Sequence, residues 1–122
     1  MRSSTHRGEA HYYAAQCHLV LKEQLKAARE LLMAMGTPGT AKTTSAKARQ
    51  KFIAVYVASG LAADALSFIA STPVHFTAES IIALLESLAS EYARLKRRTD
   101  RKVILGLLLK KWPGHAHAAS WK

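Results

Sequence analysis

Apolar residues recur every three or four positions along most of this chain, and no segment alternates apolar and polar residues over the length of a strand. This periodicity is typical of amphipathic helices, so it predicts an all-α fold. The chain has 122 residues and a hydrophobic content of 49%, which suffices for one core. We expect a single helical domain over residues 1–122, a compact bundle of four to five helices with a buried central helix, and irregular tails at residues 1–7 and 113–122.

The first predicted helix runs from Gly8 to Met35, and its apolar residues form one stripe that we expect to face the core. The stripe consists of Tyr13, Cys17, Leu21, Leu25, Ala28, Leu32 and Met35. Gly36 and Pro38 are typical of a helix end, and they predict a loop that continues to Thr44.

The second predicted helix begins at Ser45, its expected N-cap, and reaches about Ala70. From Phe52 to Ala70 the only charged residue is Asp64, and this length is close to the ~20 residues needed to cross a bilayer. Alanine and serine dilute the hydrophobicity, however, and Asp64 would be costly in lipid. We therefore expect the buried central helix of the bundle here and no membrane partner.

The third predicted helical region begins after Thr77, with Glu79 in its first turn. Its apolar stripe is formed by Ile81, Leu85, Leu88, Tyr92 and Leu95. Thr99 and Asp100 are compatible with a cap or a kink, so the sequence leaves open whether residues 78–112 form one helix or two. Pro113 and Gly114 end the pattern.

Positive charge is concentrated in the last third of the chain, and the net charge of the whole chain is +10. Eight basic residues lie within an eighteen-residue stretch that contains only one acid, Asp100; they are Arg94, Lys96, Arg97, Arg98, Arg101, Lys102, Lys110 and Lys111. Four of these arginines are three and four residues apart, so we expect them to share one helix face and to contact successive phosphates of a nucleic acid.

A second basic group precedes the apolar part of the second helix. It consists of Lys42, Lys47, Arg49 and Lys51, next to the hydroxyl groups of Thr43, Thr44 and Ser45. Residues 31–63 contain no acid. We expect this group to contact the sugar-phosphate backbone as well, which makes nucleic acid the predicted partner.

Residues Gly36–Thr43 are similar to the phosphate-binding loop of ATPases, with Ala41 in place of the second glycine. That loop requires a preceding buried strand and a parallel sheet, for which this helical chain has no place. We therefore interpret the segment as an interhelical loop and do not expect nucleotide hydrolysis.

No residue pattern indicates catalysis, a metal or a cofactor. His115 and His117 lack a third ligand at a suitable spacing, and the adjacent Cys17 and His18 point about 100° apart on a helix. The single cysteine favours a reducing compartment, and the N-terminal segment lacks the apolar core of a signal peptide. We expect a cytoplasmic protein that is not an enzyme.

Two short regions resemble the small all-helical subunits of multisubunit CRISPR effector complexes, especially the small subunit of the Cmr-type complexes. They are Arg7-Gly8-Glu9 leading into Tyr12-Tyr13, and Ser59-Gly60-Leu61 followed by Leu66-x-Phe68. Residues 36–44 have the character of an insertion, and Lys110-Lys111-Trp112 only loosely matches that family's closing residues. These departures fit a distant relative, such as the small subunit of another effector type.

The resemblance implies a non-catalytic subunit that is present in several copies and supports guide RNA or a displaced target strand, so its partner would be RNA and/or single-stranded DNA. It further implies contacts with other subunits of the complex and with further copies of itself, with an interface around Trp112 and Trp121. Two other classes stay open. One is a phage or plasmid DNA-binding or packaging protein whose arginines read bases in the major groove. The other is a scaffold whose charge serves solubility or an acidic protein partner.

Overall fold

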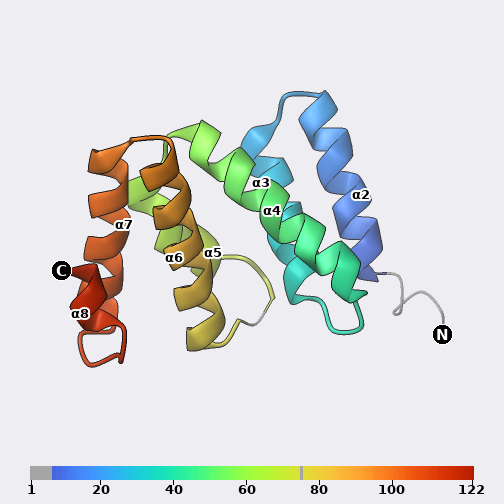
Figure 1. The fold of residues 1–122 in the computed structure, drawn as a ribbon. Coiled ribbons are helices and arrows are strands. Elements are labelled where there is room, and N and C mark those ends of the chain that lie inside the picture. The colour runs from blue at the N-terminus through green and yellow to red at the C-terminus, as the bar shows by residue number, and fades with distance from the viewer. Residues whose placement is uncertain (1–6, 75) are drawn as a thin grey trace. The chain divides into compact units, whose positions relative to one another are not determined.

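The computed structural model describes residues 7–74 and 76–122. In this part of the chain there are seven α-helices, one 3-10 helix and no strand, which confirms the predicted all-α class (Figure 1). The helices group into two units. The first contains the described residues up to Gly60 together with residues 71–76, and the second contains residues 61–70 and 77–122. We describe each unit by itself, and the single domain stays a prediction.

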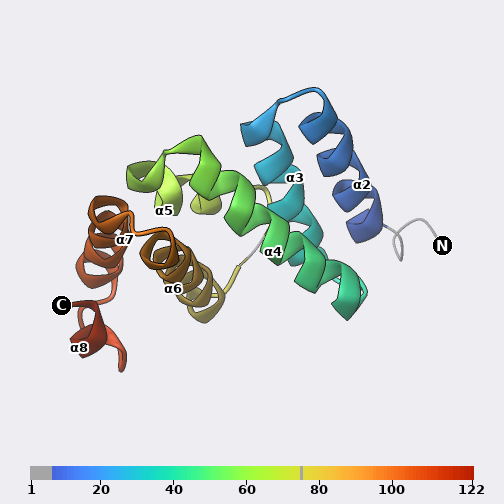
Figure 2. The same ribbon diagram turned by 45° about the horizontal axis from the view of Figure 1, so that its top comes forward.

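The first unit contains helices α2 (Arg7–Val20), α3 (Gln24–Gly36) and α4 (Lys42–Ser59). Figure 2 shows α2 and α3 side by side, with α4 packed along α3. Its largest fully buried side chains are Leu31, Leu32, Phe52 and Tyr56. The Phe52 and Tyr56 rings stack with their centroids 5.5 Å apart. Residues 71–76 complete this unit, because Val74 and Phe76 lie against Gly36, where an added Cβ would come within 2.8 Å of Val74 Cγ2.

The prediction of one continuous helix from Gly8 to Met35 is wrong, because the chain reverses between Val20 and Gln24. Lys22 adopts a left-handed conformation with φ 61°. The Lys22 N–H donates to the Leu19 carbonyl at 3.0 Å, and the Glu23 N–H donates to the His18 carbonyl at 2.8 Å. These two bonds form a Schellman motif, a helix end in which glycine normally takes the left-handed position.

This turn changes which face of α2 is buried. Gly8 and Ala15 are the buried residues of α2, whereas Tyr13 and Leu21, from the stripe that we expected to face the core, are 69% and 67% exposed. In α3 the expected residues Ala28 and Leu32 are fully buried. The predicted stripe is therefore confirmed in α3 at Ala28 and Leu32 but not at Leu25, which is 42% exposed, and it is wrong in α2.

The second predicted helix, Ser45–Ala70, is also divided. Gly60, with φ 72°, ends α4, and the chain continues as the 3-10 helix η1 (Ala62–Asp64) and helix α5 (Ala65–Ala70). Ser45 is not the N-cap, because α4 begins at Lys42 and the Glu9 carboxylate accepts a hydrogen bond from the Ala41 N–H at 3.1 Å. A carboxylate at this position complements the positive end of the helix dipole.

Helix α4 does not match the predicted helix that is buried all round. Ala48, Phe52 and Tyr56 are buried, but Lys47 and Ala54 are exposed. Among the described residues, no helix combines the length and the apolar character needed to cross a membrane.

The second unit contains η1, α5, α6 (Ala78–Arg94), α7 (Arg98–Lys111) and α8 (Ala118–Trp121). Thr77 is the N-cap of α6, as expected, because its hydroxyl oxygen accepts the Ser80 N–H at 3.1 Å. Residues 78–112 form two helices instead of one. The tail at residues 113–122 is not entirely irregular, since it contains α8 with Trp121 buried. Of the predicted tail at residues 1–7, all but Arg7 lies outside the described residues.

Replacing Lys22 with glycine should stabilise the protein by about 1 kcal/mol, because glycine adopts the left-handed conformation without the steric cost of a Cβ. The contrasting change Lys26→Gly, in the first turn of α3, should instead destabilise it by about 1 kcal/mol, because glycine is unfavourable in a helix and the bond from Lys26 to Glu23 is lost. Urea unfolding followed by helical circular dichroism measures both values. If both variants lost the same free energy of unfolding, the left-handed conformation of Lys22 would be contradicted.

Candidate nucleic-acid interface

The eight basic residues near the C-terminus are distributed over a helical hairpin. Arg94 ends α6, Lys96 and Arg97 lie in the turn, and the other five belong to α7. The prediction that four arginines share one helix face is wrong, because α6 ends at Arg94 and the chain changes direction before α7. Lys96 takes the left-handed position, with φ 61°, of a second Schellman motif. The Lys96 N–H donates to Ala93 O at 3.0 Å, and the Arg97 N–H donates to Tyr92 O at 2.8 Å.

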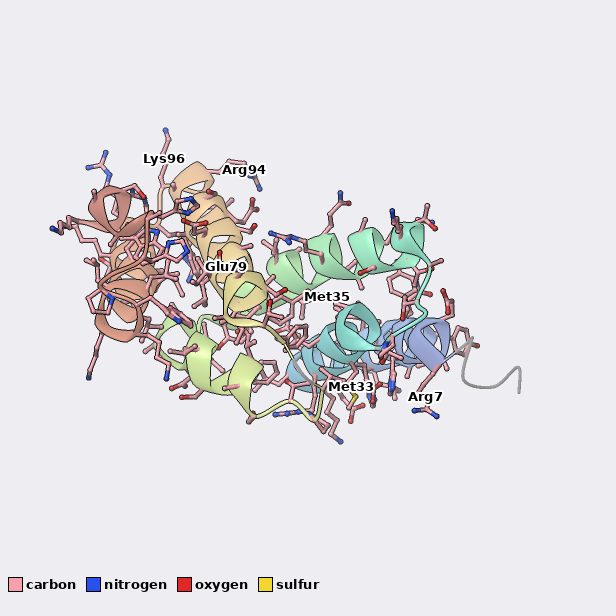
Figure 3. The ribbon with its side chains drawn as sticks, turned by 90° about the horizontal axis from the view of Figure 1, so that it is seen from below. Arg7, Met33, Met35, Glu79, Arg94 and Lys96 are labelled. Carbon is pink, nitrogen blue, oxygen red and sulfur yellow. The ribbon has the colours of Figure 1, made fainter. Side chains whose placement is uncertain are left out.

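Two of the arginines are held by neighbouring acids. Arg94 bonds Glu91 through Nε at 2.9 Å, and this hydrogen bond lowers the pKa of Glu91, which therefore remains charged at neutral pH. Arg97 bonds Asp100 at 2.7 Å, and its guanidinium lies 5.0 Å from the centre of the Tyr92 ring. Figure 3 shows the Arg94 and Lys96 side chains extending from this end of the hairpin. Much of the positive charge of Arg94 and Arg97 is thus balanced locally.

Five of the eight basic residues belong to α7, and three of them lie along its exposed side. Arg98, Lys102 and Lys110 are separated by four and eight residues, and Gly106 between them is also exposed. We call these three residues the α7 basic stripe. The opposite side carries the buried Ile104 and Leu108. In the described part of the chain, none of the three stripe residues makes an ion pair with an acid.

The stripe has the dimensions of a backbone-binding surface. From Arg98 to Lys110 the helix rises roughly 18 Å, which is long enough for several successive phosphates of one strand. Arg101 and Lys111 are exposed beside it. The small Gly106 leaves open space in the middle of the stripe, since no atom lies near the position of an added Cβ. This arrangement suits contacts that do not depend on base sequence.

The second predicted group lies on α4, in the other unit. Lys42, Lys47 and Lys51 are exposed, and Arg49 is half-buried. Lys47 and Lys51 are one turn apart on the same side. The Glu9 carboxylate, however, already occupies the start of α4, where a phosphate would otherwise be favoured. The α4 group is therefore the weaker candidate.

The loop that is similar to a phosphate-binding loop follows α3 instead of a strand. Its N–H groups are used internally, since Thr37 donates to Met33 O at 3.0 Å and Ala41 donates to Glu9 at 3.1 Å. The loop borders a cavity of about 550 Å³ that also includes Arg7 and Met33, both labelled in Figure 3. Because the loop follows a helix and two of its N–H groups already have acceptors, it differs from the N–H cradle of an ATPase, which follows a strand.

The C-terminal segment forms a polar cluster with α6 that the sequence analysis did not anticipate. His115 Nε2 lies 3.0 Å from a Glu79 carboxylate oxygen, and His117 Nδ1 lies 2.9 Å from Glu86 Oε2. Trp121 Nε1 donates to the same Glu86 oxygen at 2.9 Å. Among the described residues, no three His, Cys, Asp or Glu side chains gather as metal ligands would. The one local sign of an ordered C-terminal segment was Trp121, a large aromatic residue near the end of the sequence.

A shallow groove of about 280 Å³ lies beside this cluster. Its lining residues come from α6, α7 and the C-terminal segment, and they are Glu86, Ala89, Ser90, Ala93, Arg101, Leu105, Ser120 and Trp121. The groove is smaller than the usual binding site of a cofactor or drug-sized ligand, which occupies roughly 300–1,000 Å³. The α7 basic stripe thus remains the strongest candidate for a binding surface.

Comparison of the chain with protein-family models, with curated proteins and with solved structures found no match. The assignment of a binding surface therefore depends on the exposure, the spacing and the ion pairing of the basic residues.

The hydroxyl of Tyr92, in the last turn of α6, is buried without a hydrogen-bond partner among the described residues. Tyr92→Phe should therefore stabilise the protein by about 1 kcal/mol at neutral pH, since an unsatisfied buried hydroxyl is costly. Burial, followed by the nearby Asp100 charge, raises the pKa of Tyr92 above its ordinary value of 10.0. The folded state thus favours the neutral hydroxyl, and stability should fall as the pH rises above about 10.

The measurement is the free energy of unfolding of both proteins from pH 7 to pH 11. The wild-type protein should lose more stability than Tyr92→Phe above pH 10, and the two should run parallel below it. A variant that is less stable than the wild type at pH 7 would show that the hydroxyl has a partner.

Proposed function

We propose that this protein is a non-catalytic subunit of a CRISPR RNA-guided effector ribonucleoprotein and contacts the phosphate backbone of the guide RNA or target strand. The α7 basic stripe is the contact surface, assisted by Lys96, Arg101 and Lys111. Other subunits and further copies of the chain are its protein partners. The observation that carries the proposal is a helix with a buried apolar side and an exposed side of basic residues that form no ion pair within the described part of the chain.

Charge and geometry favour backbone contacts over the reading of bases. Helices α6 and α7 run side by side in opposite directions (Figures 1 and 2). A helix-turn-helix protein instead sets its recognition helix at about 90–120° to the preceding helix. The hairpin therefore gives less support to the alternative, a phage or plasmid DNA-binding or packaging protein.

The effector-complex part of the proposal is supported by the resemblance around Arg7-Gly8-Glu9 and Ser59-Gly60-Leu61. Affinity purification of the tagged protein from its native host, with and without nuclease treatment, tests it. Recovery of a stoichiometric complex with large partner proteins and a discrete small RNA is expected. Recovery of the protein by itself, or with random duplex DNA, would overturn this part of the proposal.

Neutralising the α7 basic stripe should weaken binding to single-stranded RNA and should reduce its salt dependence. For the variant Arg98→Gln/Lys102→Gln/Lys110→Gln, the slope of log affinity against log salt should fall by about two, because each of the three lost phosphate contacts removes about 0.7. Fluorescence anisotropy with a labelled RNA of mixed sequence, at several salt concentrations, measures the slope.

The control variant carries Arg7→Gln, Lys26→Gln and Lys122→Gln, which remove the same net charge from positions outside both predicted basic groups. It should retain most of the wild-type slope. An equal loss in both variants would mean that only the total charge matters. Wild-type binding without any salt dependence would favour the scaffold alternative.

A further inference from the structure

Helix α2 exposes a row of apolar side chains. Tyr13 is 69% exposed, Val20 82% and Leu21, in the following turn, 67%. Cys17 between them is also exposed. We call these four residues the α2 strip. They recur at three- and four-residue steps and therefore lie on one side of the helix, opposite the buried Ala15.

The strip is large for a surface in contact only with water. Tyr13, Val20 and Leu21 are each exposed over about two thirds of their surface or more, whereas exposed apolar residues of a monomeric protein are usually scattered singly. Contiguous patches of this kind are typical of interaction surfaces.

The stretch of chain that carries the strip is formally uncharged. Residues 10–21 contain no aspartate, glutamate, lysine or arginine, although the chain as a whole carries a net charge of +10. The two histidines of α2 are paired with acids: His11 lies 2.6 Å from Glu30, and His18 lies 2.7 Å from Glu23. Two copies of so basic a chain repel each other over most of their surface, but they can approach each other at α2.

The order of residues along the strip is suited to a two-fold pairing. Cys17 is four residues from Tyr13 and four from Leu21, so the small side chain lies midway between two large ones. When a second α2 is placed antiparallel with Cys17 at the crossing point, Tyr13 of each copy faces Leu21 of the other. A small residue at the crossing point allows close approach of the helices, and the same patch serves both copies.

We propose that the α2 strip is the interface between two copies of this chain, related by a two-fold axis near Cys17. The inference rests on the part of the proposed function in which several copies act together, and it names the surface through which they meet. An interface made of two such strips is small, near or below the roughly 1,000 Å² that a specific interface normally buries. The dimer is therefore weak in isolation and is strengthened when a common nucleic acid raises the local concentration of the copies.

Sedimentation equilibrium of the full chain without nucleic acid, over a wide range of protein concentration, tests the interface. The wild-type protein should show reversible dimerisation, and Val20→Lys should raise the dimer Kd by about tenfold or more. The control is Ala54→Lys, which adds the same charge at an exposed position of α4 and should leave the Kd nearly unchanged. Because Val20 is 82% exposed, both variants should retain the wild-type circular dichroism spectrum.

Cross-linking identifies the pairing itself. A short bismaleimide should join Cys17 of two copies, since Cys17 is the only cysteine. The covalent dimer should be nearly absent in Val20→Lys and absent in Cys17→Ser. A wild-type chain that stays monomeric overturns the inference, and so does a dimer that is insensitive to Val20→Lys.

The two proposals fail in different ways. A chain that binds RNA with the expected salt dependence but never dimerises overturns the α2 interface only. A chain that dimerises through α2 but binds no nucleic acid overturns the proposed contact surface on α7, because the dimer is measured without nucleic acid.

Discussion

The arrangement of both helical hairpins depends on two lysines that adopt a left-handed backbone conformation. Lys22 ends α2 and Lys96 ends α6, each with φ 61° and each within the same pair of backbone hydrogen bonds. In both turns the side chains at the ends of the motif interact: His18 bonds Glu23, and Arg97 lies over the Tyr92 ring. These contacts offset part of the cost of a left-handed residue that has a Cβ, which is about 1–2 kcal/mol. The exposure of the α2 strip and the position of the α7 basic stripe both follow from these turns.

Much of the helical content could be predicted from local signals. The Thr77 cap, the helix ends at Gly36 and before Pro113, and the absence of strands are all readable from neighbouring residues. The turns at Lys22 and Lys96 were not predictable in this way, because lysine has no preference for the left-handed region. Once the first turn was missed, the apolar stripe was extended through it, and α2 was assigned the wrong buried face. Gly60 was an available signal for the end of α4, but the apolar residues that continue after it concealed the break.

The candidate site was predictable in composition but not in detail. Counting residues identified a basic region, yet it could not show that Arg94 and Arg97 are held by Glu91 and Asp100, because these pairs depend on where one helix ends and the next begins. The exposed side of α7 becomes evident only once the helix is known to start at Arg98. The clusters of His115 and His117 with carboxylates of α6 join residues more than thirty positions apart, and no local pattern encodes such contacts.

The two units are interleaved along the chain, and this connectivity affects folding during synthesis. The chain forms most of the first unit, enters the second at residue 61, and returns to the first at residues 71–76 before the second is completed. Most helix contacts join sequence neighbours and can form quickly. The first unit nevertheless stays incomplete until Val74 and Phe76 have left the ribosome and can cover Gly36. No cut between two adjacent residues separates the units, so neither one corresponds to a contiguous fragment that can be produced separately.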